Sequence, residues 1–296
     1  RLSDGDVGNS PFFSEMRIAG ATDYIALPLH MSDGGVHATS WITAHADGFS
    51  DAQLDALRAL MPALTRMIEI WTLRRTAAGL LNNYVGERAG SRILAGQIRR
   101  GHTESMHAAI WLSDLRGFTA LSDRLSPDAV VGLLNTYFDC QVPAILDHGG
   151  EVLKFMGDGL LAVFPMAEDE SDAAEICRHV MDAARQSRAN VAAMTHPHGG
   201  EMLDGFRFGL ALHVGTVLYG NIGGGDRLDF TCIGPAVNLA ARLEKMAGRL
   251  GRTVVASSAF AGHADMDWAD LGVFSVSGFS AAQRVYGLKD ETSSAS

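Results

Sequence analysis

The feature that most constrains the fold is a regular alternation of apolar, strand-like runs with amphipathic, helix-like segments after His107. The run "HAAIWLSDL" (107–115) predicts a strand, and residues 126–150 predict a helix with Ser126 as its N-cap and Pro127 at its first position. Two strands around a tight turn follow in "GEVLKFMGDGLLAVFP" (150–165). We then expect a helix over 169–194, strand material over 206–222, a helix over 235–251, and strands over 253–260 and 283–288. Such alternation predicts an α/β fold in which helices cover a sheet.

A different pattern occupies the N-terminal part of the chain. Residues 22–44 read as two strands around "SDGG", a hairpin signal. Residues 49–71 carry a helical stripe of apolar side chains that begins at a capping-box pair, Ser50 and Gln53, and we expect Pro62 to kink or interrupt this helix. Residues 17–75 resemble the last part of a GAF-type sensor domain, and a small α/β cap used for dimerisation is the alternative.

These patterns divide the chain into four parts. We expect an N-terminal regulatory segment over 1–78, a connector over 79–104, a main domain over 105–290 and a polar tail over 291–296. With 296 residues, 47% of them hydrophobic, the chain can form one large or two modest cores.

Composition also limits the partners and the compartment. The formal charge of −10 and the lack of a strong Lys/Arg cluster argue against nucleic-acid binding. No apolar run reaches the roughly 18 to 20 residues that span a bilayer, so we expect no membrane span. The three cysteines, Cys140, Cys177 and Cys232, form no CxxC pair, which argues against a disulfide framework or a zinc site and favours a cytoplasmic protein.

Three short motifs carry chemistry. In "WLSDLRGFT", Asp114 ends an apolar strand, and Gly117, Phe118 and Thr119 form a turn whose exposed N–H groups suit phosphate oxygens. In "KFMGDG", Asp158 lies in a glycine-flanked turn. Two carboxylates at strand ends beside a phosphate-binding turn suit Mg²⁺, which takes a few carboxylates and completes its coordination with phosphate and water.

The third motif is "DFTCIGPAVNLAARLE", where Asn238 and Arg242 stand four residues apart and share a helix face. Arginine gives planar, multidentate donation to a phosphoryl group, and asparagine can hold a sugar oxygen. Each motif alone is typical of ordinary turns, caps and solvated faces, and the ordinary interpretation of Lys154 is a strand-edge lysine that discourages edge pairing.

Together and in this order, the motifs resemble the catalytic domain of class III nucleotidyl cyclases over residues 105–289. The resemblance implies a ferredoxin-like fold and a homodimer with two active sites at the subunit interface. It implies two Mg²⁺ or Mn²⁺ ions per site, and ATP or GTP as the substrate. The implied metal ligands are Asp114, Asp158 and the backbone of Leu115; Lys154 and Thr231 of the other subunit would read the base, Asn238 would orient the ribose, and Arg242 would stabilise the transition state.

The polarity of hydrogen bonds then indicates which base is read. Adenine presents an acceptor at N1 and a donor at N6, whereas guanine presents a donor and an acceptor at the corresponding atoms. A lysine can only donate, so Lys154 suits adenine N1, and Thr231 can accept from N6. The sequence therefore favours an adenylate cyclase that makes cyclic AMP from ATP.

One position departs from the family pattern. A lysine that contacts the triphosphate in the family is replaced by Ser277, and Arg227 could supply a compensating charge. Two alternatives remain: a guanylate or dual-specificity cyclase, and a degenerate cyclase module that binds nucleotide without turnover. A P-loop enzyme is set aside because the chain has no GxxxxGK[ST].

Overall fold

The computed structural model describes residues 11–97, 99, 101, 103–198, 201–224 and 227–291, without the side chains of His198, Glu201 and Arg227. The chain forms two compact units, one up to Leu80 and one from Leu81 onward. The second unit contains all three motifs singled out in the sequence.

The first unit is built on a β-hairpin and a long helix. After α1 (Pro11–Ile18), strands β1 (Asp23–His30) and β2 (Val36–Thr43) pair antiparallel, as predicted. Leu27, Leu29 and Met61 form its small buried core. The hairpin and helix agree with the predicted elements, whereas the likeness to a GAF-type domain stays a prediction.

Helix α2 (Asp51–Val85) begins as the sequence predicts but continues further. The Ser50 N–H donates to Gln53 Oε1 at 2.9 Å, and the Gln53 N–H donates to Ser50 Oγ at 3.4 Å, which completes the capping box. Of the two effects expected at Pro62, the interruption was wrong, because the helix runs through it, and the kink stays a prediction. A proline leaves the carbonyl four residues earlier without its helical partner, and here that residue is the exposed Arg58, where water can satisfy the oxygen.

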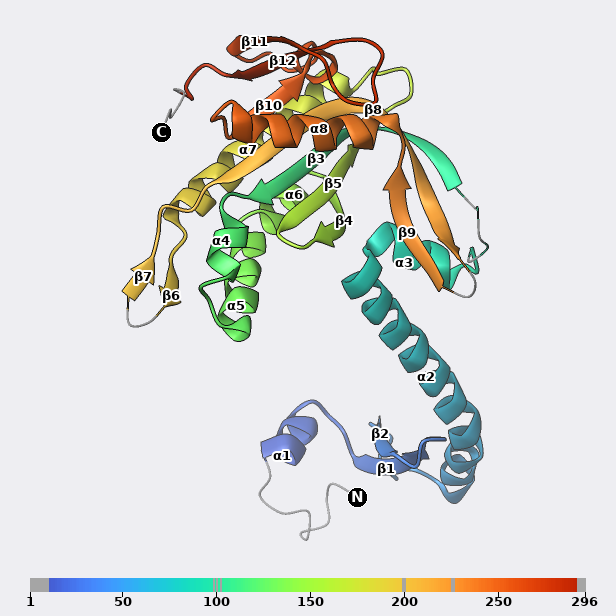
Figure 1. Ribbon diagram of the computed structural model, residues 1–296. Coiled ribbons are helices and arrows are strands. Elements are labelled where there is room, and N and C mark those ends of the chain that lie inside the picture. The colour runs from blue at the N-terminus through green and yellow to red at the C-terminus, as the bar shows by residue number, and fades with distance from the viewer. Residues whose placement is uncertain are drawn as a thin grey trace. The chain divides into compact units, whose positions relative to one another are not determined.

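The second unit is a sheet of eight strands with the order β11-β12-β10-β8-β3-β5-β4, and β9 pairs with β8 (Figure 1). The order β8-β3-β5-β4, with antiparallel pairing throughout these four strands, is the ferredoxin-like arrangement that the family resemblance implies. The strands are β3 (Thr103–Leu115), β4 (Glu151–Met156), β5 (Gly159–Pro165), β8 (Phe208–Gly224), β9 (Arg227–Ile233), β10 (Val254–Ser257), β11 (Trp268–Phe274) and β12 (Gln283–Leu288).

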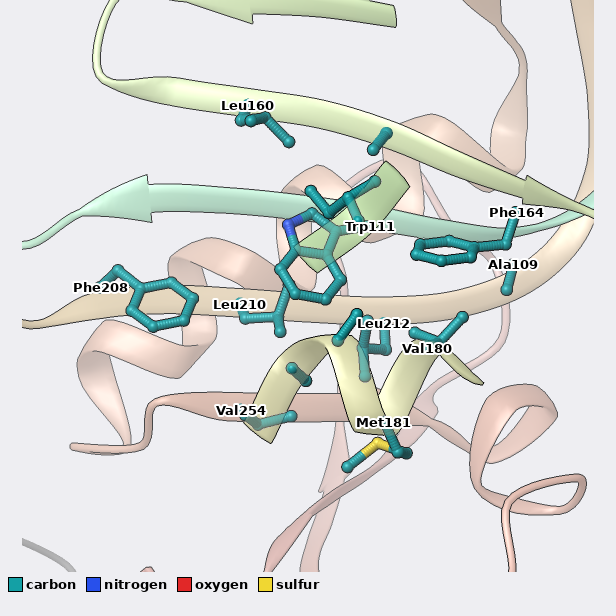
Figure 2. Packing of buried hydrophobic residues seen from close by; sticks show 14 of the residues in the cluster. Ala109, Trp111, Leu160, Phe164, Val180, Met181, Phe208, Leu210, Leu212 and Val254 are labelled. Carbon is teal, nitrogen blue, oxygen red and sulfur yellow. The ribbon is translucent and has the colours of Figure 1, made fainter. Parts of the chain in front are cut away.

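Strand β3 is the centre of this sheet and is buried on both faces. Ala109 and Trp111 point into one core cluster, and Ile110 and Leu112 into another, as the period of two requires. Figure 2 shows Trp111 among side chains of β5, β8 and a helix, including Leu160, Leu210 and Val180. Burial on both faces explains why the strand reads as a nearly continuous apolar run.

Helices cover both faces of the sheet. Helix α7 (Ala173–Ala193) packs in the cluster around Trp111, whereas α8 (Pro235–Arg249) packs in the clusters of the opposite face. Alpha-helical turns also occur in α3 (Glu87–Leu94), α4 (Phe118–Ser122) and α9 (Ser258–Ala261), and a short ribbon joins β6 (His196–His198) to β7 (Glu201–Leu203).

Two sequence expectations in this unit were wrong in detail. The single helix expected over 126–150 is two helices, α5 (Pro127–Asp139) and α6 (Val142–Asp147), because Pro143 favours a new helix start. Strand β11 was not predicted, because a bulge between Asp270 and Gly272 interrupts its alternation.

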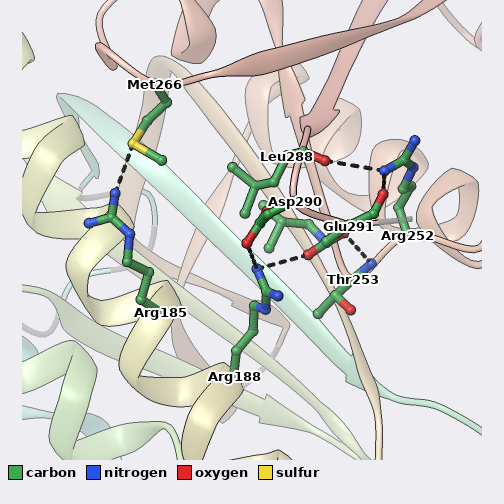
Figure 3. Close-up of polar contacts among 9 residues, drawn as sticks. Arg185, Arg188, Arg252, Thr253, Met266, Leu288, Asp290 and Glu291 are labelled. Atoms are coloured by element: carbon green, nitrogen blue, oxygen red, sulfur yellow. Dashed lines mark hydrogen bonds and ion pairs between the residues drawn. The ribbon is translucent and has the colours of Figure 1, made fainter. Parts of the chain in front are cut away.

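The end of the unit is fastened by a buried glutamate, Glu291 (Figure 3). Its carboxylate accepts from the Thr253 N–H at 2.9 Å and from the Val254 N–H at 3.2 Å, and it lies 3.3 Å from Arg188 on α7. These contacts join the segment after β12 to β10 and α7.

Residues Pro127–Asp147 are long and apolar enough to cross a membrane by length and composition alone, so the expectation of no membrane span is not confirmed. In the structure this stretch is α5 and α6, whose Leu133, Tyr137 and Ile145 are fully buried in the core of the second unit.

Candidate active site

Two carboxylates lie together at one end of the sheet. Asp114 is the second-last residue of β3 and pairs in register with Gly159. Asp158 lies in the adjoining β4–β5 turn, where Gly157 has a φ of +66°. Burial, a hydrogen bond that the protonated Asp114 donates to Asp158, and the charges of Asp158 and Glu244 raise the pKa of Asp114 to about 7, while the charge of Arg116 lowers it. The antiparallel register therefore brings two acidic groups, 44 positions apart in sequence, into direct contact.

This pair fits a divalent cation. Two half-buried carboxylates repel one another unless a proton or a cation lies between them. Within the described ranges, no group of three or more His, Cys, Asp or Glu side chains could hold a metal. An ion bound by Asp114 and Asp158 would therefore take further ligands from backbone oxygens, water or substrate, which is the usual coordination of Mg²⁺.

The turn after Asp114 is held by an ion pair that sequence reasoning missed. Arg116 Nη1 lies 2.9 Å from Glu244 Oε1 on α8, and the glutamate is buried. A Cβ added to Gly209 would come within 1.8 Å of the Arg116 guanidinium, so the guanidinium lies directly over that strand. Gly117 then turns the chain with a φ of +75°. The ion pair thus fixes the start of the phosphate-binding turn predicted over Gly117, Phe118 and Thr119.

Lys154 lies on β4 beside a cavity of about 940 Å³. Its ammonium forms an ion pair with Asp229 on β9, and the described contacts include none with Asp158 or Thr231. Asp229, Phe155 and Phe230 also line the cavity, whereas Thr231 does not. The structure therefore pairs the two charges of "KFMGDG" with different groups, Lys154 with Asp229 and Asp158 with Asp114.

Helix α8 presents the third motif to solvent. Asn238 and Arg242 are both exposed, while the opposite face of the helix packs on the sheet through Ala236, Leu239, Ala240, Leu243 and Ala247. Neither side chain contacts Asp114 or Asp158 among the described interactions. Ser277 is exposed in the turn after β11, and the side chain of Arg227 lies outside the described part of the chain.

A comparison with protein families decides what these motifs are. Residues 102–289 match the model of the adenylate and guanylate cyclase catalytic domain. The chain belongs to the class III nucleotidyl cyclases. Domains of this family bind nucleotide, generally use divalent metals and typically act as dimers.

Individual relatives agree with this family. Adenylate cyclase 1 of Rhizobium meliloti is 33% identical over 178 residues, which are 59% of this chain and 26% of the relative. A bacterial light-regulated adenylyl cyclase has a TM-score of 0.60 at 24% identity and covers 80% of this chain and 67% of that one. A guanylate cyclase domain from Catenaria anguillulae, solved in complex with GTP, has a TM-score of 0.50 at 19% identity and covers 62% and 96%.

The two solved structures support the cyclase fold. The chain spans only 26%, 6% and 31% of the length of three curated relatives that it matches.

Three residues of this cyclase site escaped sequence reasoning: Arg116, Glu244 and Asp229. Strand β9, which carries Asp229 and Thr231 two positions apart, was not predicted, so no pattern indicated where Asp229 lies or which residue is its ion partner. The Arg116 pair had a faint signal in Gly209, a glycine inside a buried strand, which often marks close approach of another group.

Proposed function

We propose that this chain is an adenylate cyclase, which converts ATP to 3′,5′-cyclic AMP and pyrophosphate as a homodimer with shared active sites. The observation that carries the proposal is the contact between Asp114 and Asp158 at the end of β3, inside the segment that matches the cyclase family. Half-buried acidic groups that contact one another repel unless a proton or a cation lies between them. A reaction on a triphosphate that uses metal ions explains why Asp114 and Asp158 lie together, because the ions offset their repulsion.

The reaction requires the ribose 3′-oxygen to attack the α-phosphorus in line and to expel pyrophosphate. Two Mg²⁺ or Mn²⁺ ions, held by Asp114, Asp158 and the Leu115 carbonyl, would lower the pKa of the attacking hydroxyl and neutralise triphosphate charge. The N–H groups of Gly117, Phe118 and Thr119 would bind phosphate oxygens.

The exposed face of α8 completes the site from the other subunit. Asn238 would orient the ribose by donating its amide N–H to the ring oxygen or by hydrogen bonding with a ribose hydroxyl. Arg242 forms no ion pair with any described residue, so its guanidinium is available for charge that develops on the phosphoryl group. Its removal should therefore lower kcat more than it raises KM.

The donor and acceptor positions of the two bases favour ATP over GTP. Lys154 donates to adenine N1, and guanine N1–H would meet a second donor there. Thr231 accepts from adenine N6, and Arg227 compensates for Ser277 at the triphosphate. The proposal includes a cytoplasmic location and a regulatory role for residues 1–78, passed to the catalytic domain through residues 79–104.

The test is to incubate the purified chain with ATP and GTP separately, with Mg²⁺ or Mn²⁺, and to identify the products by mass spectrometry. We expect cyclic AMP to dominate, and Asp114→Asn to lower kcat by about 100-fold or more. Asp270→Asn is the matched control, because it removes a carboxylate that pairs with Arg284 on the far edge of the sheet. If cyclic GMP forms as fast as cyclic AMP, the chain is a dual-specificity enzyme. If neither nucleotide gives a cyclic product, the chain is a degenerate module.

A further inference from the structure

The guanidinium of Arg116 is enclosed between a strand and a helix of the second unit. Gly209 on β8 and Gly248 on α8 leave the space for it: a Cβ at Gly209 would overlap Nη2, and one at Gly248 would lie 2.9 Å from Nη1. The Arg116 backbone N–H donates to the Arg207 carbonyl at 2.8 Å. Because the side chain has little room, a shift of the turn after Asp114 must also move the guanidinium.

This guanidinium binds α8 at two points. Nη1 lies 2.9 Å from Glu244 Oε1, and Nη2 donates to the Glu244 backbone carbonyl at 3.3 Å. The Glu244 side chain is only 7% exposed, so its charge needs a close partner, which Arg116 provides. Arg242 lies two residues earlier on the same helix and is exposed. The ion pair therefore ties the turn after Asp114 to the helix that carries Arg242.

The same ion pair lies within electrostatic reach of the two acidic groups. Besides burial and the contact with Asp158, the charge of Glu244 raises the pKa of Asp114, whereas the charge of Arg116 lowers it. A cation held by Asp114 and Asp158 would attract the glutamate and repel the arginine. Both members of the pair therefore experience a change of force when the metal site fills.

In the proposed dimer the two ends of this ion pair belong to different active sites. The turn of one chain binds the triphosphate in one site, while α8 of the same chain supplies Asn238 and Arg242 to the other site. The ion pair lies within one chain, so it joins the two sites without crossing the subunit interface. Coupling between two sites requires such an element, one that a ligand at either site can stabilise.

We propose that Arg116 and Glu244 are positioning residues that couple the two active sites: a nucleotide bound at the turn of one chain fixes α8 of that chain for the second site. The inference rests on the proposed function, because it takes the shared arrangement of the sites from it. Since the first nucleotide prepares the second site, we expect the second to bind with an intrinsic affinity about 5-fold or more above that of the first.

The test is a calorimetric titration of the dimer with α,β-methylene-ATP in Mg²⁺, an analogue that cannot expel pyrophosphate. Wild type should show the tighter second step. Glu244→Gln keeps the shape of the side chain but removes its charge, so we expect two equal and independent sites. Glu291→Gln is the matched control and should keep the coupling, because Glu291 is also 7% exposed and lies 3.3 Å from an arginine, Arg188, on α7 (Figure 3).

A second variant keeps both charges and changes only the space around them. Gly248→Ala should displace the guanidinium from Glu244, while alanine favours the helix at this position. We expect it to reduce the coupling as Glu244→Gln does, and thermal unfolding shows that each variant is folded. The inference is overturned if the coupling survives both substitutions in folded dimers, or if the two sites of wild type bind independently.

Mixed dimers show which end of the ion pair acts on which part of a site. A dimer of Lys154→Ala and Asp158→Ala chains has one intact site, which takes its turn from the first chain and its α8 from the second. Glu244→Gln in the first chain should raise KM for ATP, and in the second chain lower kcat, each by about 3-fold or more. The same change from both placements, or a change from one placement alone, contradicts the coupling.

The binding titration keeps this test distinct from the proposed function. If the chain makes no cyclic nucleotide, the proposed function fails, while coupled binding that Glu244→Gln abolishes still supports the inference. If cyclic AMP forms but the two sites bind independently, the proposed function stands and the coupling fails. A chain that binds the analogue as a monomer, shown by analytical ultracentrifugation, overturns both.

Discussion

At the residue scale, Asp114 couples the stability of the metal-free protein to pH. Its pKa is about 7 in the folded chain against an ordinary value of 3.8, so the folded state retains a proton that the unfolded chain releases. The free energy of unfolding therefore falls as pH rises from about 4 to about 7, and the loss is complete above the folded pKa.

Asp114→Asn should remove this penalty, since an amide cannot ionise against Asp158. We expect the thermal midpoint of the metal-free variant to exceed that of wild type by about 2–6 °C at pH 8, and by less at pH 5. Differential scanning fluorimetry in the presence of a chelator measures both values. Addition of Mg²⁺ should raise the wild-type midpoint more than that of the variant. A variant that is less stable than wild type at pH 8 would contradict the repulsion between the two carboxylates.

The sequence allowed the carboxylate contact to be predicted but not the ion pairs around it. Asp114 lies near the end of an apolar run and Asp158 in a hairpin turn, and the family resemblance assigned both to one metal site; the pairing of β3 with β5 then places both at one end of the sheet. The partners of Lys154 and Arg116 are 75 and 128 positions away. Such pairings depend on how whole strands and helices pack, and a single sequence carries no record of which charged side chains meet.

At the element scale, α3 is attached to the strands that carry the base-reading residues. Arg88 Nε lies 3.2 Å from Glu151 Oε2, three positions before Lys154 on β4. Arg92, one helical turn later, lies over the ring of Tyr219 at 5.9 Å, and the Tyr219 hydroxyl donates to Glu151 Oε1 at 3.1 Å. Two arginines of the connector therefore contact one side of the same strand network that positions Lys154 and Phe230.

Arg88→Met keeps most of the length of the side chain but removes its charge. It should therefore break the ion pair with Glu151 on β4 without leaving a cavity. We expect KM for ATP to rise about 3- to 10-fold, because Glu151 loses one charged partner and the β4 backbone gains freedom. Steady-state kinetics give KM, and Arg284→Met is the control, since it removes an ion pair with Asp270 at the opposite edge. An unchanged KM in a folded Arg88→Met chain would show that α3 does not influence the base-reading strand.

Elements were predicted well where the apolar period was unbroken. Strand β3 and helix α7 were predicted from their patterns, whereas the break between α5 and α6 was not, and the interruption expected in α2 at Pro62 was wrong. Both misses involve proline, whose effect depends on whether the orphaned carbonyl is exposed to water or must be satisfied within the protein. Solvent exposure of a helix turn is a tertiary property, which a local pattern cannot supply.

At the scale of the whole molecule, the proposed dimer divides the roles of one hairpin between two sites. Asp158 contacts Asp114 of its own chain, and Lys154 pairs with Asp229 on β9, the strand that also carries Thr231. If the metal-binding residues of one subunit act on a nucleotide whose base the other subunit reads, each active site needs intact metal-binding residues from one chain and intact base-reading residues from the other. A site shared by two subunits exists only in one relative arrangement of them.

Complementation between variants tests this division. Lys154→Ala and Asp158→Ala homodimers should both be inactive, because each lacks one set in both sites. Mixed dimers combine the two defects in one site and leave the other intact, so an equimolar mixture that exchanges subunits should recover about a quarter of wild-type activity.

The matched control mixes Asp114→Ala with Asp158→Ala chains. Each mixed dimer then has one damaged metal set in each site, so no site is intact and no activity should return. Product formation is measured after co-refolding, with dimer content determined by analytical ultracentrifugation. Recovery in the control would show that Asp114 and Asp158 act in different sites. No recovery with Lys154→Ala and Asp158→Ala, despite dimer formation, would show that both residues of the hairpin act in the same site.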